Sequence, residues 1–403
     1  MYIKLAWRNL WRNKRRTIIT VASVMLAVML STLMRCMQLG TYDKMIENVV
    51  GFYSGYIQIS SADFNEEPNI DNGFELTDTI LNVLNDEKSI TAFAPRQESF
   101  VWLSSDSASK GAFLIGAFPD KEEIVTSLSD KVVKGKYFTA DSRDLLLAEG
   151  VAEKLKVDVG DTIVLIGQGY HGLTAAGKFP VGGILSFGSP DLNKRMVYMP
   201  IREMKELTGG DVVTSVSLML ENNRDLPMID SKLQQKLGSD FAVKTWKEIM
   251  PELEQAIQAD NAGGLIMAGV LYFIIAFGIF GTLLMMLAER MHEFGMLISL
   301  GMKNIWISIV VIIESFLIGL LGTLAGMTFS IPLVAWFFYH PIRFTGEVAE
   351  GYASYGFEPV MFVSSDPSIF ISQALLVFSI MLALSLFPFI RILRIKPVEA
   401  MRR

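Results

Sequence analysis

Four long apolar runs constrain the fold of this chain more than any other feature of its sequence. They cover residues 17–34, 265–287, 305–339 and 369–390. A helix needs about 20 predominantly apolar residues to cross the hydrocarbon core of a bilayer. We therefore expect a membrane protein with four transmembrane α-helices. The third run is longer than a bilayer requires, so we expect it to tilt or to project beyond the membrane.

A polar block, residues 40–262, separates the first apolar run from the second and is large enough to fold as a domain. Alternation with period two predicts strands within it, and apolar residues at helical spacing predict short helices. Strands are expected at 56–60, 91–103, 112–117, 144–147, 162–166, 179–185, 196–200, 212–221 and 241–246, and helices at 76–84, 149–155, 201–208 and 226–237. Helical segments at 42–50 and 248–260 would carry this α+β domain on two stalks.

Charge is distributed unevenly along the chain. Residues 1–16 carry six basic side chains and no acidic one, and residues 391–403 carry five basic side chains and one acidic. The polar block carries 34 acidic against 21 basic residues, a net of −13. The positive-inside rule then places both termini in the cytoplasm and the polar block outside it. An acidic outer domain on a chain with an overall charge of −6 also argues against a nucleic-acid partner.

These observations give an expected order of segments. It is a cytoplasmic interfacial helix (1–16), a span (17–39), the extracytoplasmic domain (40–262), a span (263–288), a cytoplasmic connecting helix (289–304), a span (305–339), an extracytoplasmic loop (340–368), a span (369–390) and a cytoplasmic tail (391–403). The first segment interleaves Trp7 and Trp11 with basic residues, which is typical of an amphipathic interfacial helix. Alternatively, it is a charged flank that only anchors the first span.

The segment from Glu289 to Gly301 joins two apolar runs over a short distance. It is charged at its start and amphipathic after that, and Gly301 can end it as a helix C-cap. We expect a small helix that lies at the membrane surface and offers a face to another protein.

The third apolar run contains one acidic residue, Glu314. A carboxylate inside a membrane is a candidate functional group, because its placement in lipid costs at least ~2.5 kcal/mol. The alternative is a structural role, in which Glu314 pairs with a donor on a neighbouring helix. Gly319, Gly322 and Gly326 follow it and form a small-residue face that lets another helix approach closely.

The sequence contains no pattern that indicates catalysis or metal binding. There is no GxxxxGK[ST] phosphate loop, no G-x-S-x-G turn and no H-E-x-x-H pair. His171 lies in a glycine-rich stretch at 167–178, expected to be a hairpin tip, and has no second ligand at metal-binding spacing. The single cysteine, Cys36, excludes an internal disulfide. We therefore expect no catalytic residue, no metal and no cofactor bound by this chain, and energy must come from elsewhere.

Four stretches of the sequence resemble a known family. The most specific resembles the coupling-helix segment of the FtsX/MacB/LolC-LolE permeases of ABC transporters, and reads Glu289-Arg290-x-x-Glu293-Phe294-Gly295-Met296-Leu297-x-x-Leu300-Gly301. The two ends are similar to those of the family, in Ala6-x-Arg8-Asn9-Leu10-x-Arg12 and Arg394-Ile395-Lys396-Pro397-Val398-Glu399-Ala400-Met401-Arg402. The stretch from Leu146 to Thr162 resembles the MacB-like periplasmic domain.

The resemblance implies a non-catalytic permease subunit of the bacterial inner membrane. It implies two copies of a separate ATPase that bind ATP and Mg²⁺, a second permease that is identical or paralogous, and mechanical transmission to the periplasm. The residues implied to couple to the ATPase are Glu289, Arg290, Glu293, Phe294, Gly295, Leu300 and Gly301.

Within the family, the stretch Tyr56-Ile57-Gln58-Ile59 and the four spans favour the lipoprotein-releasing LolC/LolE branch. In that branch a hairpin tip can bind a soluble lipoprotein carrier, and Gly169, Tyr170, His171, Gly172 and Leu173 occupy that place here. The alternatives are a MacB-like efflux or export permease and an FtsX-like regulator of a cell-wall hydrolase that transports nothing. A purely structural membrane anchor would need no coupling segment.

Overall fold

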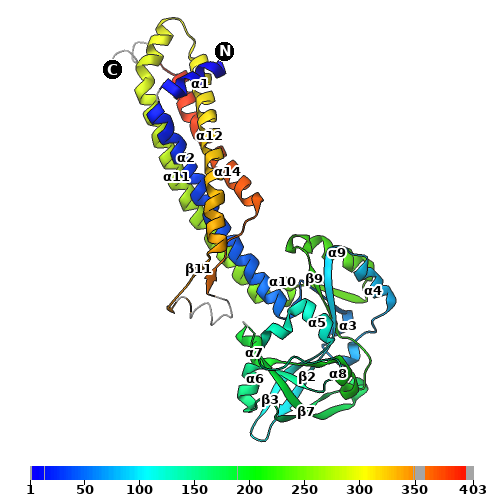
Figure 1. The fold of residues 1–403 in the computed structure, drawn as a ribbon. Helices are drawn as coiled ribbons and strands as arrows, with labels where there is room; N and C mark the ends of the chain where they lie inside the picture. Colours follow the sequence, from blue (N-terminus) through cyan, green and yellow to red (C-terminus); the bar gives the residue numbers. More distant parts are fainter. Residues whose placement is uncertain (1, 13, 188, 348, 350–358, 396–403) are drawn as a thin grey trace. The chain divides into compact units, whose positions relative to one another are not determined.

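The computed structural model describes residues 2–12, 14–187, 189–347, 349 and 359–395 (Figure 1). The chain divides into two compact units. The membrane unit comprises Met1–Asp43, Ile257–Arg343 and Val360–Arg403, and the inserted domain comprises Lys44–Ala256 with Phe344–Pro359. Most of the expected tail and of its family-like motif, residues 396–403, lies outside the described residues.

Long helices build the membrane unit. They are α1 (Tyr2–Arg12), α2 (Lys14–Val49), α11 (Pro251–Ser299), α12 (Asn304–Tyr339) and α14 (Pro367–Leu393). Within the described residues, four of them (α2, α11, α12 and α14) are long and apolar enough to cross a membrane, with mean hydropathies of 2.1–2.5. The four expected spans are therefore confirmed. A short two-stranded ribbon, β11 (Ile342–Arg343) with β12 (Val360–Met361), lies between α12 and α14 in the chain.

The glycine face of α12 contacts two different helices. A side chain at Gly322 would meet Cβ of Val24 at 2.6 Å, and one at Gly326 would meet Cβ of Val28 at 2.6 Å, both on α2. Gly319 instead faces α14, where Sδ of Met381 lies 3.0 Å from the position of such a side chain. Because these three glycines of α12 have no side chains, α2 and α14 can pack directly against its backbone.

The expectation of a separate surface helix at 289–304 is wrong. Helix α11 continues without interruption from Pro251 to Ser299 (Figure 1). The helix does not stop at the charged residues because the apolar stripe of the span continues through Met291, Phe294 and Ile298, which pack into the same core. It ends as predicted at Gly301, whose φ of 97° and hydrogen bond to the Ile298 carbonyl (2.9 Å) form a Schellman turn together with Met302 N–H on Leu297 O (3.0 Å).

The inserted domain is built on a ten-stranded mixed sheet in the order β10-β1-β9-β2-β3-β8-β5-β7-β4, with β6 paired to β2 and β7. The strands are β1 (Ile57–Ser61), β2 (Ile90–Ser104), β3 (Ser109–Ala117), β4 (Val132–Gly135), β5 (Leu145–Ala148), β6 (Thr162–Gln168), β7 (Thr174–Leu185), β8 (Met196–Pro200), β9 (Ser215–Leu220) and β10 (Phe241–Thr245). The helices are α3 (Ala62–Glu66), α4 (Asp78–Asn85), α5 (Pro119–Thr126), α6 (Glu149–Leu155), α7 (Pro190–Arg195), α8 (Ile201–Thr208), α9 (Leu226–Leu237) and α10 (Trp246–Ile249).

The core of this domain follows from the alternation in its strands. In β2, Val101 and Leu103 point into the core, whereas Phe100 and Trp102 are exposed on the other face of the sheet. The predicted α+β class is confirmed, and α6, α8 and α9 have the expected bounds. The sequence analysis missed α5 and α7, which are short helices that each begin at a proline. The predicted first stalk is the end of α2, and a single π-helical turn, Val50–Ser54, follows it.

Candidate functional site

A buried polar cluster joins three helices of the membrane unit. Glu314 of α12 is 1% exposed. Its carboxylate accepts a hydrogen bond from Asn9 Nδ2 of α1 at 2.7 Å and a second one from Arg290 Nη1 of α11. The amphipathic helix α1 is therefore held against α11 and α12 through one carboxylate. Of the two interpretations of Glu314, the structure provides the pairing that the structural one requires.

Arg290 is buried, although it belongs to a segment that the sequence predicted to lie at the surface. It is 6% exposed, and its guanidinium lies 5.1 Å from the ring centroid of Phe294, which is itself 3% exposed. Its Nε has no hydrogen-bond partner among the described residues and lies 3.6 Å from a carboxylate oxygen of Glu293. A buried guanidinium needs carboxylates such as those of Glu314 and Glu293 close to it, because an unpaired charge is costly to remove from water.

A second ion pair links α1 to α11 at the surface. Arg12 Nη2 donates to both carboxylate oxygens of Glu293 at 2.6 Å. The two side chains are 55% and 45% exposed, so this pair contributes about 0–1 kcal/mol to stability. Glu293 therefore connects the buried cluster, through Arg290, to the surface of the unit.

The residues implied to couple to an ATPase fall into two groups in the structure. Arg290, Phe294 and Gly295 are buried and support the end of α11 from inside. Glu289 and Gly301 are exposed, and Leu300 is 79% exposed. Together with Glu293, Met296 and Leu297, these exposed residues form what we call the α11 end surface. It is apolar at its centre, because Met296 and Leu297 are 49% and 40% exposed.

The hairpin tip considered for carrier docking is shorter than expected and is held by the rest of the inserted domain. Strands β6 and β7 leave only residues 169–173 between them, closed by Gly169 N–H on Leu173 O at 2.7 Å. The backbone N–H of His171 donates to Asp71 Oδ1 at 2.5 Å. In the described part of the chain, no group of three potential metal ligands occurs. Leu173, 59% exposed, is the apolar side chain that this tip presents, and carrier binding there stays a prediction.

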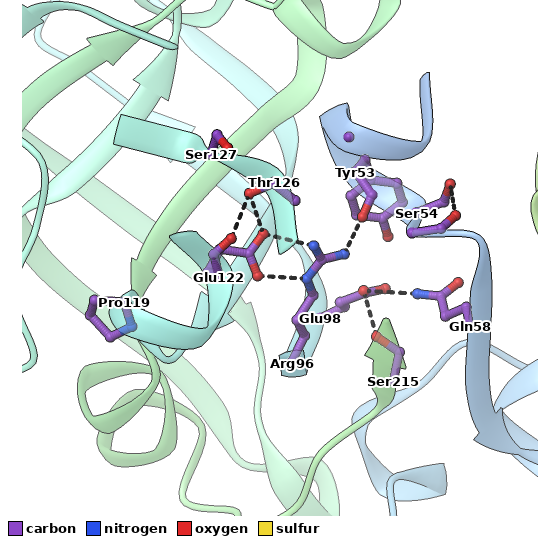
Figure 2. Close-up of polar contacts among 12 residues, drawn as sticks. Tyr53, Ser54, Gln58, Arg96, Glu98, Pro119, Glu122, Thr126, Ser127 and Ser215 are labelled. Carbon is purple, nitrogen blue, oxygen red and sulfur yellow. Dashed lines mark hydrogen bonds and ion pairs between the residues drawn. The ribbon is translucent and has the colours of Figure 1, made fainter. Parts of the chain in front are cut away.

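A buried ion pair in the inserted domain was missed by the sequence analysis. Arg96 of β2 and Glu122 of α5 have fully buried side chains, and two hydrogen bonds of 2.8 and 2.7 Å join them (Figure 2). Arg96 also donates to the Tyr53 carbonyl at 2.5 Å, in the turn that follows α2. Burial alone would lower the pKa of Arg96, but the Glu122 carboxylate outweighs it and raises that pKa. The available signal was Pro119 followed by acidic residues, which is typical of a helix start.

The missed residues also include a polar network between α2 and α11 in the membrane unit. Arg35 Nη1 donates to Gln38 Oε1 at 2.7 Å and to Asn261 Oδ1 at 3.1 Å. Tyr42 donates to Asp260 on the same side. The basic residue that ends the first apolar run therefore pairs with another helix, and Gly264 of α11 leaves room for Gln38.

The fold and this site define a membrane protein in which a domain is inserted between the first two of four spans. Family models match both parts of the chain. The MacB-like periplasmic core domain matches residues 17–236, more than half of the chain, and the FtsX-like permease C-terminal model matches residues 265–397. The chain belongs to the FtsX/MacB/LolC family of ABC transporter permeases. Members of this family are permease subunits that work with ATPase partners.

Relatives are distant. The chain is 24% identical to the lipoprotein-releasing system transmembrane protein LolC of Neisseria meningitidis over 68% of this chain and 69% of that protein. The LolC of Xylella fastidiosa is 26% identical over 59% of each chain. The macrolide export ATP-binding/permease protein MacB of Escherichia coli is 27% identical over 34% of this chain and 22% of that protein. The crystal structure of the periplasmic region of MacB from Actinobacillus actinomycetemcomitans covers 52% of this chain and 98% of its own, at 18% identity and a TM-score of 0.36.

Proposed function

We propose that this chain couples ATP hydrolysis on a separate ATPase to the release of lipoproteins from the bacterial inner membrane. The α11 end surface would contact the ATPase on the cytoplasmic side, and the inserted domain would act in the periplasm. Two copies of the ATPase, which hold the ATP and Mg²⁺, and a second permease would complete the assembly.

One observation carries the coupling part of this proposal. The exposed residues Glu293 and Leu300 belong to a helix end that is fixed from inside by the Arg290–Glu314–Asn9 cluster. An exposed apolar surface held by a buried charge network is suited to transmit a force, because it cannot yield locally without leaving a buried charge unpaired. Helix α11 is also continuous from Pro251 in the inserted domain to this end. The similarity to LolC proteins supports the lipoprotein part.

The proposal is tested with the complex purified through its ATPase and reconstituted into liposomes that contain a lipoprotein. We expect Glu293→Lys or Gly301→Pro to abolish the stimulated ATP turnover, because one reverses a charge on the α11 end surface and the other cannot adopt a φ of 97°. Glu252→Lys is the matched control, since it makes the same change at the other, exposed end of α11 and should leave turnover intact.

Two results would contradict different parts of the proposal. Turnover equal in Glu293→Lys, Gly301→Pro and the control would remove the α11 end surface from the coupling. Normal ATP turnover without any ATP-dependent release of lipoprotein into the soluble fraction would leave the coupling intact and exclude the cargo.

A further inference from the structure

A groove in the membrane unit lies where α1 turns back against α2. It has a cavity volume of about 460 Å³, within the range of small-molecule sites. Its walls come from α1, from the first turns of α2 and from α12, and the residues that line it include Trp7, Trp11, Lys14, Val21, Ala22 and Ala325. The buried cluster around Glu314 does not include any of these residues.

The shape of this groove is fixed by contacts behind it. The Thr17 hydroxyl donates to the Leu10 carbonyl at 2.8 Å and so holds the end of α1 against the start of α2. On the opposite side, Gly322 and Gly326 bring α12 against Val24 and Val28 of α2. The neighbours of these glycines, Leu321 and Ala325, then become one wall. The groove is therefore a consequence of how the three helices pack.

The chemistry of the lining points to an amphiphile with a negative head. Of the described residues that line the groove, Lys14 alone carries a charge, and it is exposed. Trp7 and Trp11, with ring centroids 6.0 Å apart, are 45% and 54% exposed, as is common for tryptophans at the interface between lipid and water. Residues 1–16 contain no acidic residue that would oppose an anion.

We propose that this groove binds one anionic phospholipid, with an acyl chain along Val21, Ala22 and Ala325 and the phosphate at Lys14. The charge complementarity of Lys14 favours this occupant over a helix of a second copy of the chain, for which an apolar lining alone would suffice. Basic pockets between membrane helices bind acidic lipid head groups in this way. The proposal does not depend on the cargo or on the ATPase.

The experiment uses the full chain in bilayers of phosphatidylcholine mixed with phosphatidylglycerol, followed by extraction and native mass spectrometry of retained lipid. We expect phosphatidylglycerol to be retained preferentially. Lys14→Glu should weaken its retention by at least fivefold, as expected for about 1 kcal/mol per basic group near the surface. Lys14→Arg should restore it. Lys4→Glu, an equal charge change on an exposed residue of α1 outside the groove, should change it less than twofold.

A second pair of variants tests the acyl-chain part of the site. Ala325→Phe fills the groove and should remove retention of the lipid. Ala383→Phe makes the same change on an exposed residue of α14 that does not line the groove, and should retain it. Equal retention in all variants would overturn the proposal. A second result would also overturn it. If Ala325→Phe and Lys14→Glu changed the oligomeric state but not the amount of retained lipid, the groove would be occupied by a second copy of the chain.

Discussion

The two units of this protein each bury an arginine–glutamate pair, and the two pairs differ in how they are closed. In the inserted domain, Arg96 and Glu122 are joined by two hydrogen bonds, and both side chains are fully buried (Figure 2). The Thr126 hydroxyl adds a further hydrogen bond to Glu122 at 3.1 Å. In the membrane unit, Arg290 meets Glu314 through one nitrogen, and its Nε faces the half-exposed Glu293.

This difference separates a structural pair from one that can respond to a partner. We call the fully buried pair of Arg96 and Glu122 the sealed pair. It has no other partner to turn to, so it fixes β2, α5 and the turn at Tyr53 in one geometry. The pair in the membrane unit is open on one side, because Glu293, which lies 3.6 Å from Arg290 Nε, is half-exposed and also pairs with Arg12 at the surface. A partner that competes for Glu293 at the surface would therefore change the electrostatic surroundings of a buried arginine.

The largest effect is expected at the sealed pair. Glu122→Gln leaves the Arg96 charge buried without a counterion, and we expect the free energy of local unfolding in β2 and α5 to fall by about 3–5 kcal/mol. Hydrogen exchange measured by mass spectrometry on the full chain in detergent checks this. Asp120→Asn, an exposed neighbour on the same helix, should cost less than about 0.5 kcal/mol. Equal exchange in both variants would show that the pair does not hold this joint.

A smaller loss is expected at the open pair. In Glu314→Gln the Arg290 guanidinium can turn toward Glu293, so we expect a loss of about 1–3 kcal/mol, confined to α1 and the end of α11. The double variant Glu314→Gln/Arg290→Gln removes both charges. It should be less destabilised than the single variant Glu314→Gln, in which the charge of Arg290 stays buried without Glu314. The same hydrogen-exchange measurement applies. A loss as large as that of Glu122→Gln would break the comparison, because the open side would then provide no relief.

The smallest effect on stability is expected at the surface pair. Arg12→Glu should change the opening free energy of α1 by less than about 1 kcal/mol, because the pair with Glu293 is exposed. Arg12→Lys, which keeps a positive charge beside Glu293 and leaves that carboxylate facing Arg290, should recover most of that loss. If Arg12→Glu instead released the whole of α1, Arg12 and not Asn9 would be the residue that holds this helix.

The sequence predicted the membrane unit well where a residue stood out from its surroundings. Glu314 could be found because it is an acid in an apolar run, and Gly301 because it follows a helical stripe. Arg96 could not be found in the same way. An arginine in an alternating strand is normally taken to face water, and its burial depends on α5, whose Glu122 lies 26 residues further along the chain.

The shape of the coupling segment was predicted wrongly for a related reason. The charges at Glu289 and Arg290 suggested that the span had ended, whereas Arg290 is neutralised inside the unit and the helix continues through it. Charge alone therefore does not end a helix when a buried partner is available on a neighbouring one. That partner, Glu314, lies 24 residues away, across a turn whose geometry the sequence did not specify.

The most direct test of the account is a cross-link from the α11 end surface. Cys36 is buried, so Leu300→Cys supplies one accessible thiol that can carry a photoactivatable cross-linker. We predict that it cross-links to the copurifying ATPase, and that Leu265→Cys does not, since Leu265 is an exposed leucine (59%, against 79% for Leu300) near the start of the α11 span. If Leu300→Cys gives no cross-link to the ATPase in the assembled and active complex, the α11 end surface is not the point of contact and the central claim is contradicted.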